Sequence, residues 1–211
     1  MNNELIKRVL SSIILIPLVL YFILAGSFYF IFFTIICFLV ASYEWHKMTK
    51  KIHYKLLGLI FLIFSFFTFY ESLIDFYTGI FVLLICVATD VGGYIFGKIF
   101  KGPKLTKLSP NKTYAGVIGG YTCSIILFFT ILKINLIDKQ YFINFLIFII
   151  LISSISQFGD ILVSYFKRLS KIKDTGKIIP GHGGLLDRVD GMIFAFPFSY
   201  LILFTNLFNN F

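Results

Sequence analysis

The feature that most limits what this chain can fold into is a series of seven apolar stretches. Their expected ranges are 9–25, 28–42, 56–70, 76–96, 114–132, 141–166 and 189–207. A helix needs about 20 apolar residues to cross a bilayer. Hydrophobic residues make up 58% of the 211 residues, more than one soluble core of this size could bury. We therefore predict a single-domain, all-α polytopic integral membrane protein with about seven transmembrane helices.

Lysines and arginines are confined almost entirely to one set of alternate loops. Of the 19 basic residues, 17 lie at the start of the chain or in the loops after the second, fourth and sixth stretches. Only Lys133 and Lys139 lie in the other set. Because cytoplasmic loops retain positive charge, we expect the N-terminus inside and the C-terminus outside a bacterial inner membrane. The basic start and the later apolar stretches favour a retained anchor over a cleaved signal peptide.

Ionisable residues are unevenly distributed along these stretches. Up to about residue 81 the stretches carry few of them, whereas the later ones end in acids and glycines. We therefore expect residues 1–81 to form a scaffold and residues 82–211 to carry the chemistry. The three cysteines lie inside apolar stretches without short spacing, so they supply neither a metal site nor a disulfide framework.

The fourth stretch and the basic loop after it form the first candidate segment. Asp90, Tyr94 and Lys98 recur at four-residue steps and therefore share one helix face. Polar groups suited to phosphate follow in the loop at Ser109, Asn111, Lys112 and Thr113, before glycines at Gly116, Gly119 and Gly120. An interfacial acid paired with a lysine, and lysines that bind anionic lipid headgroups, explain the same residues, so these interpretations stay open.

A polar stripe runs along the sixth stretch. Ser153, Gln157, Asp160, Ser164 and Lys167 recur at three- and four-residue steps on an otherwise apolar helix. The serine and glutamine side chains could simply form hydrogen bonds with neighbouring helices. A carboxylate at membrane depth is costly, however. Asp160 lies about two turns before Lys167, where it could hold a cation near the cytoplasmic side of the membrane.

The segment after this stretch collects acids, glycines and cations. Its candidate residues are Arg168, Lys173, Asp174, His182, Gly183, Gly184, Asp187, Arg188 and Asp190. Asp187 and Asp190 are three residues apart at a helix start, so both carboxylates can point the same way. With Asp160 they would form an oxygen-rich site suited to Mg²⁺ that carries phosphates. Helix capping could explain the two acids alone, but not their clustering with glycines and cations.

These residues resemble the signature of the phosphatidate cytidylyltransferases, also called CDP-diacylglycerol synthases. The matching positions are Ser164, Lys167-Arg168, Lys173-Asp174, His182-Gly183-Gly184, Asp187-Arg188 and Asp190. Further pieces similar to the same family are Asp90 to Tyr94 with Gly97-Lys98, residues 109–113, and Glu44-Trp45. The chain departs from the family in being shorter than typical members. In addition, Tyr114-Ala115 stands where the family has Trp-Glu, which removes one acid from the loop.

The resemblance implies transfer of a cytidylyl group from CTP to phosphatidate, which gives CDP-diacylglycerol and pyrophosphate. It implies Mg²⁺ held by Asp160, Asp187 and Asp190, with room for a second cation. The partners expected are the two substrates and membrane lipid, without nucleic acid, and a homodimer stays open. Catalytic roles are expected for Asp160, Lys167, Arg168, Asp174, His182, Asp187, Arg188 and Asp190. Substrate binding is expected for Asp90, Tyr94, Lys98, Ser109, Asn111, Lys112, Thr113, Ser164, Lys173, Gly183 and Gly184.

Two other functions fit parts of the sequence. A CTP-dependent polyprenol or phytol kinase would use similar membrane acids, but would transfer the γ-phosphoryl group and need a general base for its alcohol acceptor. A transporter would need an acidic pathway through the membrane, whereas the acids here gather near one face. The cytidylyltransferase therefore remains the principal prediction.

Overall fold

In a computed structural model the described part of the chain, residues 3–106, 109, 112–134, 142–179, 181 and 183–205, forms helices joined by short connections. The helices are α1 (Asn3–Ala25), α2 (Ser27–Met48), α3 (Ile52–Ile74), α4 (Phe76–Phe100), α5 (Tyr114–Lys133), α6 (Phe142–Leu169), α7 (Leu186–Val189) and α8 (Met192–Phe204). No β-strand occurs in this part of the chain, where two isolated bridges are the only β pairing. The predicted all-α fold is confirmed.

Five of the described helices, α2 to α6, are long and apolar enough to cross a membrane. The shorter apolar helices are Ile13–Ala25 within α1, and α8, which has 13 residues. The seventh expected stretch is divided, because a turn at Asp190 and Gly191 separates α7 from α8. The chain is therefore a multi-pass membrane protein, while the count of seven spans stays a prediction.

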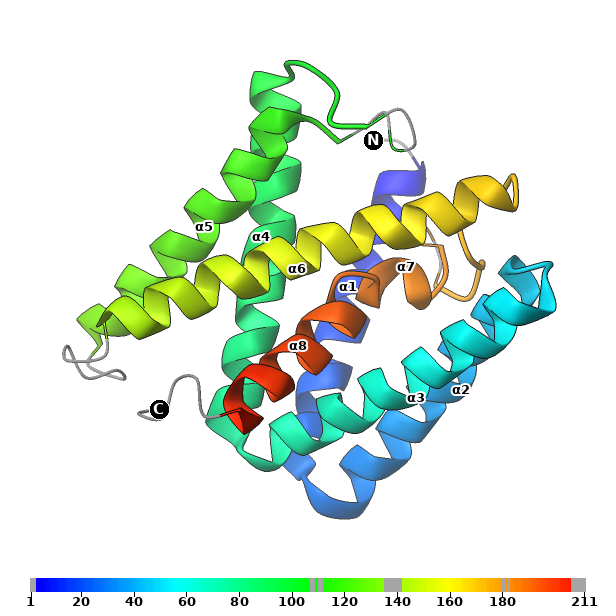
Figure 1. Cartoon of the computed structure of the whole chain (residues 1–211), viewed down its shortest axis with the longest axis horizontal. Coiled ribbons are helices and arrows are strands. Elements are labelled where there is room, and N and C mark those ends of the chain that lie inside the picture. Colours follow the sequence, from blue (N-terminus) through cyan, green and yellow to red (C-terminus); the bar gives the residue numbers. More distant parts are fainter. Residues whose placement is uncertain are drawn as a thin grey trace.

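The helix connections form two groups at opposite sides of the molecule (Figure 1). The α2–α3 turn, the α4–α5 loop and the α6–α7 loop lie toward the upper right, whereas the α1–α2 and α3–α4 connections lie toward the bottom of the view. The first group consists of the lysine-rich loops. This alternation is what the charge distribution predicts for a protein that crosses the membrane repeatedly.

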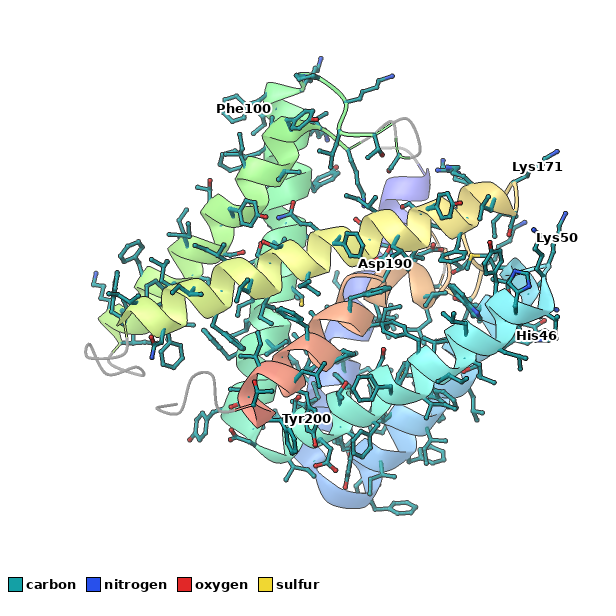
Figure 2. All side chains as sticks on the ribbon, in the orientation of Figure 1. His46, Lys50, Phe100, Lys171, Asp190 and Tyr200 are labelled. Carbon is teal, nitrogen blue, oxygen red and sulfur yellow. The ribbon has the colours of Figure 1, made fainter. Side chains whose placement is uncertain are left out.

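The short helix α8 packs against α3, α4 and α6. The main core cluster is formed by buried residues of α4, α5, α6 and α8: Val82, Ile85, Cys86, Phe128, Phe148, Ile149, Ile152, Ala195, Phe196 and Ile202. A second cluster joins Trp45 of α2 to Val163 of α6 and Leu186 of α7. The fold thereby brings the first half of the chain against the polar segment that follows α6. Figure 2 shows Asp190 close to α6, near the middle of the bundle.

Glycines allow α4 and α5 to pack closely along their length. A Cβ atom added to Gly92 would lie 2.2 Å from the carbonyl oxygen of Gly119, and one added to Gly116 would lie 2.8 Å from that of Gly93. Small residues permit such backbone contact between membrane helices. Gly116, Gly119 and Gly120 are buried, so the structure gives a packing role to glycines that the sequence suggested for phosphate.

The orientation in the membrane can be tested with two exposed connections, one at each side. In a background lacking the three native cysteines, we expect the Asp75→Cys variant to react with an impermeant maleimide on spheroplasts. The Lys50→Cys variant should react only after the membrane is permeabilised, because its lysine-rich turn should face the cytoplasm. The opposite labelling pattern would contradict the predicted orientation.

Candidate functional site

The first part of the α6 stripe joins three helices through a buried hydrogen-bond network. The Thr89 hydroxyl lies 2.8 Å from that of Ser124 and donates to the Ser153 hydroxyl at 2.9 Å. Gln157 donates to the same Ser153 oxygen at 3.4 Å. The predicted hydrogen bonding between helices is therefore confirmed for Ser153, which links α6 to α4 and α5, whereas the bond that Gln157 donates to Ser153 lies within α6.

Two glycines bring α6 against the turn between α7 and α8. A Cβ atom on Gly159 would lie 2.9 Å from the carbonyl oxygen of Asp190, and one on Gly191 would lie 2.4 Å from the Ser156 hydroxyl. Because no side chain separates the two backbones, the carboxyl groups of Asp190 and Asp160 lie close together. The structure thus brings together two acids that are 30 positions apart in the chain.

These two carboxyl groups differ in their exposure to solvent. The side chain of Asp160 is 32% exposed, whereas that of Asp190 is 12% exposed. Asp190 is therefore the more buried of the two acids at the junction of α6 and α8. Asp90 of α4 is a third acid near Asp160, and Lys112 and Arg188 are close enough for their charges to act on it. A bound cation would offset the repulsion among these acids.

Two lysines are paired with the acids. Lys112, from the α4–α5 loop, lies 2.6 Å from a carboxylate oxygen of Asp160. Lys167, on α6, donates to Asp187 at 2.9 Å and lies 4.0 Å from Asp190. Lys167 is only 8% exposed, so the two carboxylates provide the counter-charge that an ammonium group needs when it is withdrawn from water.

Asp187 is engaged mainly with its own loop. Its Oδ2 atom accepts hydrogen bonds from the backbone N–H of Thr175 at 2.8 Å and of Gly184 at 3.0 Å, while Oδ1 accepts from Lys167. A close backbone pairing between Ile179 and Gly183 also shapes this loop. The metal role expected for Asp187 stays a prediction, since both of its oxygens have partners within the protein.

Glu44 is a site residue to which the sequence analysis gave no role. This α2 carboxylate is 1% exposed and accepts hydrogen bonds from the α6–α7 loop and the start of α7. Its sequence signal was an acid near the end of an apolar stretch, a costly placement that often marks a functional position. Which segment the acid would meet depends on helix packing, which one sequence does not reveal.

The remaining predicted residues of the catalytic segment lie around this cluster. Ser164 is buried on α6, and Arg168 donates to the Ile172 carbonyl at 2.9 Å at the end of the same helix. Lys173 and Asp174 are exposed in the loop. A Cβ atom on Gly183 would lie 3.4 Å from that of Asp174, so these two positions adjoin. His182 lies outside the described residues.

The residues predicted on α4 and in the α4–α5 loop differ in their surroundings. Tyr94 and Lys98 lie on an exposed face of α4, where the ammonium group is 3.3 Å from the phenol oxygen. Thr113 caps α5 by accepting from the Gly116 N–H at 3.1 Å. Ser109 is half-buried, and its carbonyl accepts from the Lys112 N–H at 3.0 Å. Asn111 lies outside the described residues. Of this group, Lys112 has an ion pair with the acid cluster.

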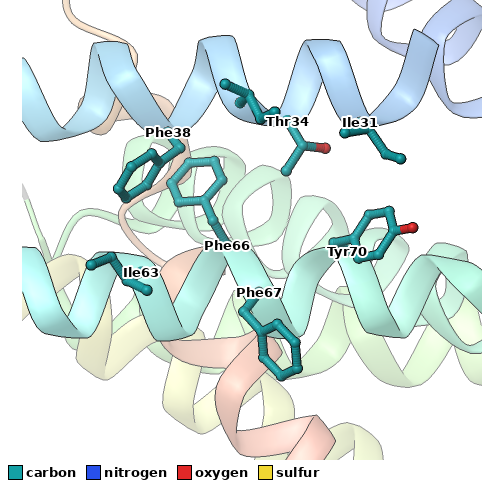
Figure 3. A pocket seen from close by; sticks show the side chains of 8 residues that line it. Ile31, Thr34, Phe38, Ile63, Phe66, Phe67 and Tyr70 are labelled. Atoms are coloured by element: carbon teal, nitrogen blue, oxygen red, sulfur yellow. The ribbon is translucent and has the colours of Figure 1, made fainter. Parts of the chain in front are cut away.

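An apolar pocket lies elsewhere, between α2 and α3 (Figure 3). Its volume is about 390 Å³, and it is lined by Ile31, Thr34, Ile35, Phe38, Ile63, Phe66, Phe67 and Tyr70. None of these residues carries a charge, so the pocket has no charged group with which to bind phosphate or a metal ion. The acid cluster is therefore the better candidate site.

The chain is similar to known proteins of one enzyme family. Residues 6–79 and 61–206 match the Cytidylyltransferase family. A phosphatidate cytidylyltransferase of Rickettsia felis is 37% identical over 215 residues, which cover 95% of this chain and 93% of the relative. That of Rickettsia typhi is 36% identical, with coverages of 93% and 90%. One from Staphylococcus haemolyticus is 41% identical over 126 residues, with coverages of 59% and 48%.

The buried ion pairs predict a large effect of removing Lys167. Lys167→Met keeps the length of the side chain but leaves Asp187 and Asp190 without their ammonium partner. We expect the free energy of unfolding in detergent to fall by about 3 kcal/mol, the usual cost of breaking a buried pair. Denaturant titration would measure it. Lys171→Met, at an exposed position, is the control, and an equal effect of the two changes would refute the buried-pair interpretation.

Proposed function

Because the chain belongs to the cytidylyltransferase family, we propose that it transfers the cytidylyl group of CTP to phosphatidate, giving CDP-diacylglycerol and pyrophosphate. The observation that carries this proposal is the cluster in which Asp90, Asp160 and Asp190 lie together with the cationic side chains of Lys112, Lys167 and Arg188. The two Rickettsia relatives named phosphatidate cytidylyltransferase match more than nine-tenths of the chain, which supports the proposal.

The position of the cluster suits a lipid substrate. Phosphatidate keeps its phosphate at the membrane interface while its acyl chains remain in the hydrocarbon. The cluster is formed near the lysine-rich α4–α5 and α6–α7 loops, where such a phosphate would be available. In a bacterial inner membrane these loops would face the cytoplasm, which supplies CTP.

The reaction depends more on neutralising the negative charges of the two phosphates than on proton transfer. An oxygen of the phosphatidate phosphate attacks the α-phosphorus of CTP, a new P–O bond forms, and the bond to the oxygen bridging the α- and β-phosphates breaks. Pyrophosphate leaves with that electron pair. The attacking phosphate is already ionised at neutral pH, so no side chain has to remove a proton. The main obstacle is the approach of two anions.

The cations of the cluster can reduce this repulsion. The Lys112 side chain is 21% exposed although its Nζ atom is buried, and its ammonium group could exchange Asp160 for a phosphate oxygen. Arg188 lies near enough to act on the charge of Asp90, and its guanidinium could bind a phosphate through two hydrogen bonds. Lys167 is more deeply buried between Asp187 and Asp190 and would mainly hold these acids in place.

The carboxylates of the cluster are the kind of ligand that a magnesium ion prefers. Hard oxygen donors are what Mg²⁺ prefers, and Asp160 and Asp190 are already in contact. These two would hold the ion, with Asp90 beside them, while Asp187 would first have to exchange its present partners. Bound Mg²⁺ would supply positive charge that stabilises the developing negative charge on the phosphates. Within the described residues no group of three metal-binding side chains is preformed.

Magnesium binding can be measured apart from activity. We expect MgCl₂ to raise the Tm of the purified protein by several degrees, because an ion bound only by the folded state stabilises it. Asp160→Asn should abolish this shift and most of the activity. Asp75→Asn, at the exposed α3–α4 connection, should retain both. If the Asp160→Asn variant kept the full Mg²⁺ shift, Asp160 would not be a metal ligand.

The reaction itself is tested with purified protein, phosphatidate, Mg²⁺ and each of the four labelled nucleoside triphosphates in turn. We expect CTP alone to give a labelled liponucleotide together with pyrophosphate, and chelation of Mg²⁺ to stop the reaction. Release of CDP without label on the lipid would instead indicate phosphoryl transfer. Equal use of all four nucleotides would contradict cytidylyl specificity.

A further inference from the structure

The carboxylate of Glu44 is surrounded by hydrogen-bond donors from a distant part of the chain. Its Oε1 atom accepts from the backbone N–H of Leu185 at 3.0 Å. Its Oε2 atom accepts from the Thr175 hydroxyl and from the backbone N–H of Leu186, both at 2.8 Å. With 1% of its surface exposed, Glu44 cannot touch a substrate in the cluster. Its effects must therefore pass through the loop that it binds.

Two loop glycines make room for this carboxylate. A Cβ atom on Gly184 would lie 2.4 Å from Oε2 of Glu44, and one on Gly176 would lie 2.5 Å from Oε1. Any other residue at these positions would push the loop away from α2. The loop is therefore shaped around an ionised side chain supplied by the half of the chain that was predicted to be a scaffold.

The same loop residues also hold Asp187. Thr175 uses its hydroxyl for Glu44 and its backbone N–H for Asp187. The N–H groups of Gly184 and Leu185, which are adjacent in sequence, bond to Asp187 and Glu44 respectively. Asp187 in turn holds Lys167, which lies 4.0 Å from Asp190. A continuous series of contacts thus connects α2 to an acid of the cluster.

We propose that Glu44 is a positioning residue for the reaction: it fixes the 175–186 loop against α2, and so keeps Asp187, Lys167 and Asp190 in place for catalysis. The proposal rests on the proposed function for its effect on turnover, whereas its effect on the loop can be measured separately. It gives α2 a part in the chemistry without contact with either substrate.

The role requires a carboxylate and not merely a side chain of this size. Glutamine has the same shape, but its amide group offers one acceptor oxygen and one donor nitrogen. In either orientation the NH₂ group faces at least one loop donor, either the Leu185 N–H or the pair formed by Thr175 and Leu186. A buried donor left without an acceptor is costly, so the loop would move away from α2.

The first test compares the kinetics of matched variants in mixed micelles. We expect Glu44→Gln to lower kcat by about 30-fold with a change in KM for CTP below about threefold, because a displaced loop weakens transition-state contacts more than ground-state binding. Glu71→Gln, the same change near the end of α3, should leave kcat unaltered. Thr175→Val should lower kcat by about tenfold and Thr175→Ser by less than about twofold, since serine retains the hydroxyl.

The double variant Glu44→Gln/Thr175→Val should be no slower than Glu44→Gln alone, because both changes break the same contact. Should Glu44→Gln fail to fold, the comparison of Thr175→Val with Thr175→Ser still decides. Equal, wild-type kcat in those two variants would overturn the proposal.

The second test measures the loop itself. Lys177 is exposed within the 175–186 loop and provides a trypsin site. We expect Glu44→Gln to raise cleavage after Lys177 by about tenfold while Tm falls by only a few degrees, as local opening without global unfolding would do. Unchanged cleavage in the Glu44→Gln variant would refute the positioning role. If the wild-type protein made no CDP-diacylglycerol, the proposed function would fail, and cleavage would still support or refute the role of Glu44 in the loop.

Discussion

The charge balance around Lys167 is the constraint on which the rest of the site depends. Lys167 is 8% exposed at the end of a membrane helix, so its ammonium group needs counter-charges, and Asp187 and Asp190 provide them from one short turn. This pairing fixes the end of α6 relative to α7 and α8. A second ion pair, between Lys112 and Asp160, holds the α4–α5 loop against α6. Acids that would repel one another are thereby kept together near the membrane surface.

Glycines are what allow these charges to meet. Gly159 and Gly191 remove the side chains that would separate α6 from the α7–α8 turn, and Gly92 with Gly119 does the same for α4 and α5. In lipid there is little hydrophobic force between helices, so close backbone contact and hydrogen bonds must hold them together. The Thr89 and Ser153 hydroxyls provide such bonds directly below the acid cluster. Packing and chemistry therefore depend on the same helix contacts.

The sequence predicted the α-helical membrane fold and the residue types of the site, because apolar length, lysine distribution and helical periodicity are local properties. The stripe from Ser153 to Lys167 was predicted on one face of α6 for that reason. Four features were not predicted. The division of the last stretch at Gly191, the packing role of Gly116 and the engagement of Asp187 with backbone amides all depend on contacts between distant segments. The partners of Glu44 escaped prediction on the same ground.

The bond between Glu44 and the α6–α7 loop also fixes the rotation of α2 about its own axis. A helix with apolar side chains on most faces has little reason to prefer one angle in lipid, and each residue of shift would turn it by about 100°. Ala41, Trp45 and Met48 share the buried side with Glu44, whereas Ile35, Leu39 and Tyr43 are exposed. The outward face of α2 can therefore exchange one apolar residue for another as the surrounding lipid changes. An insertion or deletion of a single residue before Glu44 cannot be absorbed in that way, because it would swing the carboxylate out of the protein.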